Sequence, residues 1–474
     1  MFPRILARAL GAWVLCVPLA AFAASDADLA EIRAEVRDLK DKYEARIRAL
    51  EERLKAAEAM AAPTAATTAA VTTAAGATGP ASAGAVGSTP PGGGYAASTL
   101  AAFNPGISVV LQGTYANLSQ NPAQFAINGI QTSEDVGTGR RGLGLGESEI
   151  SFFGNVDDKV AGSLTVSLSP RNEVSVEEAY GALTALPYGL VPKFGRFFSG
   201  IGYLNEQHQH VWDFQDAPLA YQAFLGNQFA QDGAQLKWVA PTDTFLEFGA
   251  EIGNGDAFPG SPRNSNGVGA GSVFVHAGGD VGDNASWRAG LSYLETRASD
   301  RQGTLPDTSD NLANVAFAGR SRTAVADFIW KYAPTGNAKR SNVKVQGEYF
   351  WRREHGELTY DANGALGVTQ TGAYSSSQSG WYLQGVWQFV PAWRVGARYD
   401  RLAPGTPDYG VNDAYLSTGA FTPQKTTVML DYTPSEFSRF RVQYAESRTR
   451  TGLTDHQLFL QYILSLGAHP AHKF

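Results

Sequence analysis

The stretch VKVQGEYFWR, residues 343–352, decides the fold. Its apolar and polar side chains alternate, as in an extended strand whose successive side chains point to opposite faces. One face holds Val343, Val345, Tyr349 and Trp351, and the other holds Lys344, Gln346, Glu348 and Arg352. The same period of two recurs at 107–116, 160–168, 235–239, 245–252, 287–293, 324–332, 381–389, 393–400, 427–432, 439–444 and 457–466. This pattern predicts an all-β protein from about residue 107 onward.

The connections between these strands separate a transmembrane barrel from a soluble sandwich. Both folds have one apolar face, but a membrane barrel turns that face to lipid and alternates short turns with long loops. Short turns fall near 157–158, 186–187, 240–241, 281–282, 333–334, 390–391 and 433–434, and long loops near 119–141, 200–230, 253–270, 297–320, 355–378 and 403–423. Seven turns and the joined ends predict a closed transmembrane barrel of about sixteen antiparallel strands, which leaves no strand edge unpaired.

Aromatic residues flank the short turns of this predicted barrel. They are Trp238, Phe245, Trp330, Tyr332, Trp387, Phe389, Trp393, Tyr432 and Phe437. Amphipathic rings prefer the headgroup level of a bilayer, so these residues predict an aromatic girdle at the periplasmic rim. The alternative is that they form the core of a sandwich.

Three segments are expected before the barrel, which we place at 103–474. Arg4 and Arg8, an apolar run at 10–20 and the small residues around 21–23 predict a signal peptide at 1–23. Apolar residues at spacings of three and four predict an α-helical coiled-coil stalk at 24–60, unless this is one amphipathic helix lying on the barrel. The Ala/Thr/Gly/Pro-rich residues 61–102 predict a flexible linker.

Cysteine content and charge exclude several classes of function. The one cysteine, Cys16, lies in the signal peptide, so the mature chain is expected to contain no disulfide, thiol nucleophile or cysteine metal site. The formal charge of −7 becomes about −9 without Arg4 and Arg8, and nucleic-acid binding needs a basic surface instead. A glycine-rich stretch at 142–146 leads into a strand rather than a helix, and the catalytic motifs Gly-x-Ser-x-Gly and His-Glu-x-x-His do not occur. We therefore expect no enzyme.

The order of signal, coiled coil, small-residue linker and barrel resembles the trimeric phosphate-selective porins. A second resemblance rests on the residues GRFFSGIGYLNEQHQH (195–210), APTD (240–243), VHAGGDVG (275–282) and GAH (467–469). It is closer and points to barrels labelled zinc-regulated TonB-dependent outer-membrane receptors. A TonB-dependent transporter needs a 22-stranded barrel and a plug, and this chain has length for sixteen strands and no plug domain. The C-terminal Phe474 is similar to the signal by which barrels meet the barrel assembly machinery.

The alternation predicts which charged residues line the lumen. The cations are Lys237, Arg288, Lys331, Lys344, Arg352, Arg394, Arg398, Arg439 and Arg441, and the acids are Glu247, Glu251, Asp327, Glu348, Asp400 and Asp431. The excess of cations gives a weak lean to anion passage. Paired charges that brace the barrel wall are the alternative for many of these residues.

The loop at 200–230 is predicted to fold into the lumen as a constriction loop. It carries Glu206, His208, His210, Trp212, Asp213 and Asp216. His208 and His210 in an extended His-x-His place both rings on one side, and imidazole with carboxylate suits zinc. Simple packing of the loop or contact with a substrate are the alternatives to a metal site.

These features together predict a porin-type channel for passive diffusion of small hydrophilic solutes or ions. It would lie in the outer membrane of a Gram-negative bacterium, in contact with outer-membrane lipid, with the stalk in the periplasm. The stalk favours a homotrimer, and its length of ~50 Å at 1.5 Å per residue could reach toward the cell wall. Two alternatives stay open: a metal (zinc)-linked outer-membrane uptake protein, and a non-conducting structural or adhesive barrel.

Overall fold

The computed structural model describes residues 105–417 and 419–467. The predicted signal peptide, coiled-coil stalk and linker, and the C-terminal Phe474, lie outside the described residues. Among the residues that are described, no helix combines the length and the apolar character that crossing a membrane requires.

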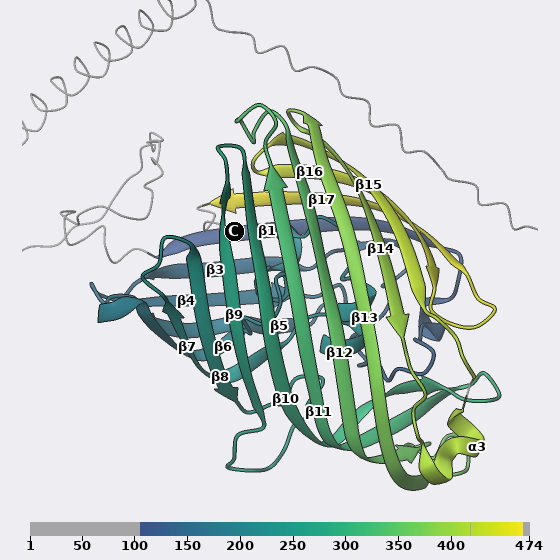
Figure 1. Cartoon of the computed structure of the whole chain (residues 1–474). Helices are drawn as coiled ribbons and strands as arrows, with labels where there is room; N and C mark the ends of the chain where they lie inside the picture. Colours follow the sequence, from purple (N-terminus) through teal and green to yellow (C-terminus); the bar gives the residue numbers. More distant parts are fainter. Residues whose placement is uncertain (1–104, 418, 468–474) are drawn as a thin grey trace, which may run out of the picture. The chain divides into compact units, whose positions relative to one another are not determined.

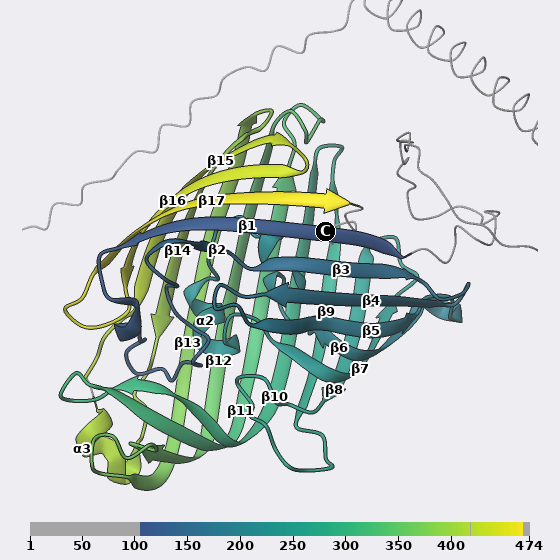
Figure 2. The same ribbon diagram turned by 180° about the vertical axis from the view of Figure 1, so that it is seen from behind.

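The described chain forms one closed antiparallel sheet (Figures 1 and 2). Its strands are β1 (Gly106–Leu118), β2 (Gly142–Leu145), β3 (Ser148–Asn155), β4 (Val160–Leu168), β5 (Val174–Leu183), β6 (Leu190–Phe198), β7 (Ala230–Val239), β8 (Phe245–Gly253), β9 (Ala270–Val281), β10 (Ala285–Pro306), β11 (Leu312–Tyr332), β12 (Asn342–Tyr360), β13 (Gln370–Val390), β14 (Trp393–Ala403), β15 (Gln424–Ser435), β16 (Ser438–Arg448) and β17 (Asp455–Gly467). Apart from β2 and β3, which both pair with β1, each strand pairs with its neighbours in sequence, and β1 pairs with β17, which closes the barrel.

Strands β2 and β3 are two parts of one barrel strand. Both pair with β1, with Leu145 opposite Gly113 and Glu149 opposite Val110. Two residues of β1 therefore face the three residues 146–148, which is the geometry of a β-bulge. Counting the interrupted strand once turns the 17 assigned strands into the sixteen that the sequence predicts.

The seven short turns lie where the sequence predicts them, but two of the predicted long loops are wrong. Residues 297–320 and 355–378 are mostly strand, because β10 to β13 continue past the rim and turn only at 307–311 and 361–369. Their small and polar residues suggested loops. The extended hairpins are instead held by an apolar cluster with the β14–β15 connection, in which Tyr374 stacks on Tyr409 and Tyr360 on Tyr415.

The outer face of the barrel is apolar. Large exposed side chains occur on strands all round the sheet: Leu111, Ile150, Phe248, Leu291, Phe328, Tyr349, Leu383, Val428, Phe440 and Leu460. Most of the predicted girdle aromatics are exposed as well, among them Trp238, Trp387 and Trp393. The alternative of a sandwich core is therefore wrong for these rings.

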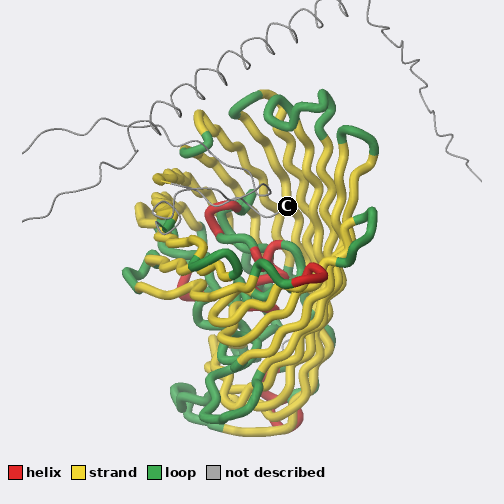
Figure 3. The backbone as a smooth tube through the Cα atoms, turned by 90° about the vertical axis from the view of Figure 1, so that its left-hand side faces the viewer, coloured by secondary structure: helices red, strands yellow, loops and turns green. Residues whose placement is uncertain are grey.

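The remaining elements are short helices in the connections. They are the 3-10 turns η1 (Pro122–Gln124), η2 (Pro187–Gly189), η3 (Leu204–Glu206), η4 (Gln209–Val211) and η5 (Gly410–Asn412), and the α-helices α2 (Leu219–Leu225) and α3 (Asp413–Leu416). Elements η3, η4 and α2 belong to the β6–β7 connection. In Figure 3 short helices, drawn in red, lie between the strand walls.

Candidate functional site: an inner segment within the barrel

The connection between β6 and β7, residues 199–229, folds into the barrel. We call it the inner segment. Its helix α2 is fully buried and packs against the inner wall at β12, β13 and β14 (Figure 2). The apolar core inside the barrel joins α2 to wall residues such as Phe350 and Tyr382 and to Ile127 and Ile130 of the β1–β2 connection. The predicted position of this loop is thus what the structure describes, and its role as a constriction stays a prediction.

Glycine lets the start of the inner segment approach the wall closely. Gly202 has a φ of 67°, a conformation that other residues rarely adopt. A methyl group at this position would also collide with Glu348 Oε2 and with the hydroxyl of Tyr221. At the other end, Gly226 takes the left-handed conformation and ends α2.

Two predicted lumen acids hold the start of the inner segment. Glu251 accepts hydrogen bonds from the Ser199 hydroxyl and from the Gly200 N–H at 2.8 Å. Glu348 accepts the N–H groups of Tyr203 and Leu204 at 3.1 and 3.0 Å. These acids therefore act as backbone anchors, because buried N–H groups need an acceptor.

Two further interactions secure α2. Asp400 accepts the N–H of Leu219 at the start of the helix, at 2.9 Å. The hydroxyls of Tyr221 and Tyr382 both donate to Glu348, the latter at 2.6 Å. These contacts could not be predicted, because neither tyrosine is close to Glu348 in sequence.

Four of the predicted lumen cations, Arg394, Arg398, Arg439 and Arg441, lie on neighbouring hairpins and are called the arginine ladder here. They are paired with acids of the inner segment and of the wall. Asp216 binds Arg398 and Lys425 at 3.1 and 2.7 Å. Asp213 binds Lys344 and Arg394. Burial alone would raise the pKa values of both aspartates, but the adjacent cations outweigh it and lower both pKa values below the ordinary range.

The rest of the ladder meets wall acids and carbonyls. Asp431 binds Arg394 and, at 2.8 Å, Arg441. Arg441 and Arg439 also donate to the carbonyl of Trp212, at 3.0 and 3.4 Å. The charges of the arginine ladder are thus largely neutralised. This agrees with the alternative in which paired charges brace the barrel wall.

Arg352 is the most enclosed of the predicted cations, with 0% of its surface exposed. It donates to the carbonyl of Ala223 at 3.1 Å and to Gln378 Oε1 at 2.7 Å, and its guanidinium lies over the Phe224 ring. This side chain holds the end of α2 and has no surface left for a solute.

A second group of predicted cations keeps partial exposure near the short turns. It consists of Lys237, Arg288, Lys331, Lys344, Arg394 and Arg439. Lys331 and Lys344 are direct cross-strand partners on β11 and β12, and Arg288 lies over the ring of Tyr203. Lys237 contacts Glu206 at 2.7 Å and Glu247 at 3.7 Å. Like charges opposite one another are unfavourable unless an acid is near, and Asp213 supplies one for Lys344. These cations are thus largely paired with acids but keep part of their surface accessible inside the barrel.

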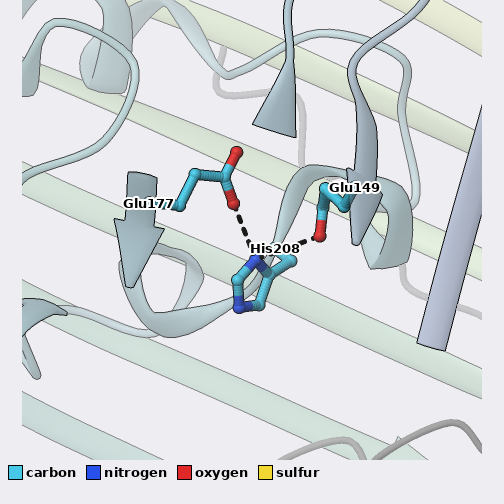
Figure 4. A group of neighbouring side chains, drawn as sticks. All are labelled: Glu149, Glu177 and His208. Carbon is cyan, nitrogen blue, oxygen red and sulfur yellow. Dashed lines mark hydrogen bonds and ion pairs between the residues drawn. The ribbon is translucent and has the colours of Figure 1, made fainter. Parts of the chain in front are cut away.

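The two predicted metal ligands occupy a cluster of titratable side chains between the inner segment and β3 and β5. We call it the glutamate–histidine cluster; its members are Glu147, Glu149, Glu177, Glu178, His208 and His210. Figure 4 shows Glu149 and Glu177 approaching the same nitrogen of His208, at 3.3 and 3.0 Å. His210 is not part of this three-residue group: its Nδ1 lies 3.0 Å from the other oxygen of Glu149.

A β-bulge brings both neighbouring glutamates of β5 to His208. Thr165 of β4 pairs with Glu178 and Val166 with Val176, so Glu177 is an extra residue in the strand. Glu177 contacts Nδ1 and Glu178 contacts Nε2 of the same ring, at 3.0 and 3.1 Å. Strict alternation would place one of the two side chains on the outer face of the barrel. Their joint contact with His208 could therefore not be predicted from the sequence.

The carboxylates set the protonation of His208. Burial lowers the pKa of a histidine, but the adjacent carboxylates of Glu149, Glu177 and Glu178 outweigh it and raise the pKa of His208 well above its ordinary value. The arrangement can hold either a proton or a cation among the same groups.

No model of a known protein family matches the chain. Among solved structures, the loop-L8 deletion mutant of OmpT from Vibrio cholerae matches with a TM-score of 0.47 and 13% identity, covering 77% of this chain and 99% of that one. The anion-selective porin of Comamonas acidovorans matches at 0.45 and 9%, covering 77% and 99%. The outer-membrane channel DcaP of Acinetobacter baumannii matches at 0.45 and 12%, covering 76% and 97%. In sequence, an uncharacterized protein of Aquifex aeolicus is 30% identical over 406 residues, 79% of this chain and 80% of that protein.

Proposed function

The chain belongs to the same family as the uncharacterized Aquifex aeolicus protein, and we propose that it is an outer-membrane porin-type channel. It would pass small hydrophilic solutes or ions by diffusion across the outer membrane of a Gram-negative bacterium. The inner segment would form the constriction.

The observation that carries this proposal is the distribution of side chains across the barrel wall. Apolar side chains such as Leu291, 62% exposed, face outward, whereas charged side chains such as Glu348 and Arg398 face inward. A sheet of this polarity is stable when hydrocarbon surrounds it and water or polar protein fills it. A closed sheet also leaves no unpaired backbone group in the lipid.

The partly exposed cations near the short turns support a weak preference for anions. The acids of the arginine ladder, Asp213 and Asp431, are almost fully buried, whereas Lys344, Arg394 and Arg439 keep 21–22% of their side-chain surface exposed. A solute entering from this side would meet cations first, and rings of charged side chains set the selectivity of pores.

Planar-bilayer recording of the purified protein tests the proposal. We expect discrete conductance steps and, under a KCl gradient, a reversal potential of the sign for mild anion preference. The double variant Lys331→Gln/Lys344→Gln should lower that preference, whereas Lys339→Gln, an exposed lysine in the β11–β12 turn, should leave it unchanged. Absence of conductance contradicts the channel, and cation preference in the unmodified protein contradicts the anion lean alone.

A non-conducting barrel is the second candidate, because two connections fill the lumen. Besides the inner segment, Ile127, Ile130 and Gln131 of the β1–β2 connection are buried, and Gln131 hydrogen-bonds to Arg301 inside the wall. Recordings that stay silent over the whole voltage range, from protein that migrates as a folded barrel, would favour this function.

The proposal extends to assembly. We propose a homotrimer in the outer membrane, with the predicted stalk in the periplasm and with the barrel assembly machinery as a transient partner. Light scattering of the detergent-solubilised protein, with and without residues 24–60, tests the trimer and the contribution of the stalk.

A further inference from the structure

The glutamate–histidine cluster has more acid than its histidines can neutralise. Its four carboxylates face two imidazole rings, and Glu147 lies within hydrogen-bonding distance of Glu177. Glu149 is 1% exposed, and its Oε2 lies 3.3 Å from His208 Nδ1 without the geometry of a hydrogen bond. Because a missing hydrogen bond is costly for a buried carboxylate oxygen, this atom is suited to accept a further ligand.

The three donor atoms are spaced like the ligands of one metal ion. Glu177 Oε2 and Glu149 Oε2 lie 3.0 and 3.3 Å from His208 Nδ1, and all three atoms lie within 4.8 Å of one another. Nitrogen and oxygen ligands about 2.0–2.1 Å from a tetrahedral zinc ion lie about 3.3–3.4 Å apart. A single proton on Nδ1 can serve only one of the two carboxylates, whereas a metal ion at the centre serves both.

The surroundings also supply the outer partners that metal ligands need. The other nitrogen of the ring, His208 Nε2, lies 3.1 Å from Glu178 Oε2, and the other oxygen of Glu149 lies 3.0 Å from His210 Nδ1. A carboxylate on the far nitrogen of a ligating histidine fixes its tautomer and raises its basicity. Glu178 and His210 are thus placed as positioning residues.

We propose that Glu149, Glu177 and His208 bind a divalent cation of the zinc class, with the fourth position open to water. The ligands come from β3, β5 and the inner segment, so the ion would fasten the η3–η4 region to the barrel wall. The arginine ladder holds the adjoining residues 210–216 through other groups, the carbonyls of His210 and Trp212 and the carboxylates of Asp213 and Asp216. The proposed metal site does not require that the barrel conduct ions.

Titration of the full chain in detergent with Zn²⁺, and with Co²⁺ as a spectroscopic probe, tests the site. The protein should carry no histidine tag. We expect one ion per chain and a tetrahedral Co²⁺ absorption spectrum. Ligand variants Glu177→Gln and His208→Gln should each weaken binding at least 10-fold, which is the smallest loss expected even for an outer partner. Absence of binding, or an octahedral Co²⁺ spectrum in the unmodified chain, overturns the proposal.

Two controls separate the site from other histidines and from misfolding. A His469→Ala/His472→Ala chain removes the C-terminal pair, and His355→Gln removes an exposed histidine of β12; both should keep the affinity of the unmodified protein. Loss of binding in either control, with binding kept in His208→Gln, would overturn the assignment. Heat-modifiable migration of each variant on a gel shows whether its barrel is folded. Where a variant does not fold, the Co²⁺ spectrum of the unmodified chain decides whether the proposed metal site exists.

Discussion

Replacing Asp216 by asparagine should release the central part of the inner segment from the wall. In the folded protein Asp216 binds Arg398 at 3.1 Å and Lys425 at 2.7 Å, and only 15% of its side chain is exposed. Asparagine keeps the shape but leaves two cations without this partner. Breaking a buried ion pair from one side costs about 3–5 kcal/mol.

For Asp216→Asn we expect the lower end of this range of about 3–5 kcal/mol. Arg398 keeps a second acid, Asp400, at 2.9 Å from its Nε, and Asp216 retains some contact with water. A cost of about 3 kcal/mol corresponds to a roughly 100-fold shift in the equilibrium from the attached to the released inner segment, at about 1.4 kcal/mol per factor of ten. The variant also removes a negative charge from the lumen.

Single-channel recording is the assay for this variant. We expect larger or more frequent open levels and a reversal potential shifted further toward anions than in the unmodified protein. Asp243→Asn, an exposed residue of the β7–β8 turn, is the matched control and should change neither. Unaltered conductance and selectivity in folded Asp216→Asn protein would refute the view that this ion pair holds a constriction.

Three further outcomes are expected. Gly202→Ala should lower the thermal stability of the folded barrel by at least about 1–3 kcal/mol, because the backbone is in a strained region for alanine and the new methyl meets Glu348; thermal unfolding in detergent measures it. Leu291→Arg should reduce folding into lipid vesicles by about 2–4 kcal/mol relative to Leu291→Ala, since a charge would then face hydrocarbon. The pKa of Asp216 is lowered in the folded state, so its stabilising contribution is complete above the ordinary carboxyl pKa of about 3.9 and is lost as the pH falls through the lower folded value. Conductance that depends on this pair should therefore be constant from pH 7 to pH 5, and a change within that window would contradict the assignment.

Strand positions and faces could be predicted from the sequence because they depend on a local rule. Val343 and Lys344 must lie on opposite faces of any regular strand, and the structure places Lys344 inside, against Asp213. The short turns were predictable for the same reason. The count of sixteen strands followed from them.

What the sequence did not show depends on contacts between distant residues. The extra residue Glu177 breaks the alternation of β5, and nothing in VSVEEAY distinguishes a bulge from a regular strand. The strands found in place of the predicted loops at 297–320 and 355–378 are held by an apolar cluster of three hairpins, with tyrosines from two of them. Glu348, predicted as a pore-lining residue, proved to anchor backbone N–H groups far away in sequence. Pairing partners of this kind are set by the closed sheet, not by neighbouring residues.

The pairing of β1 with β17 has a consequence for biogenesis. Until the last strand docks, β1 and β16 each present an open edge that could join another chain. The partners of the inner segment come from strands as late as β16, where Arg441 binds the carbonyl of Trp212. The contacts of the inner segment can therefore be completed only after β16 has joined the sheet. Barrel closure and the final packing of the interior are coupled late steps of maturation.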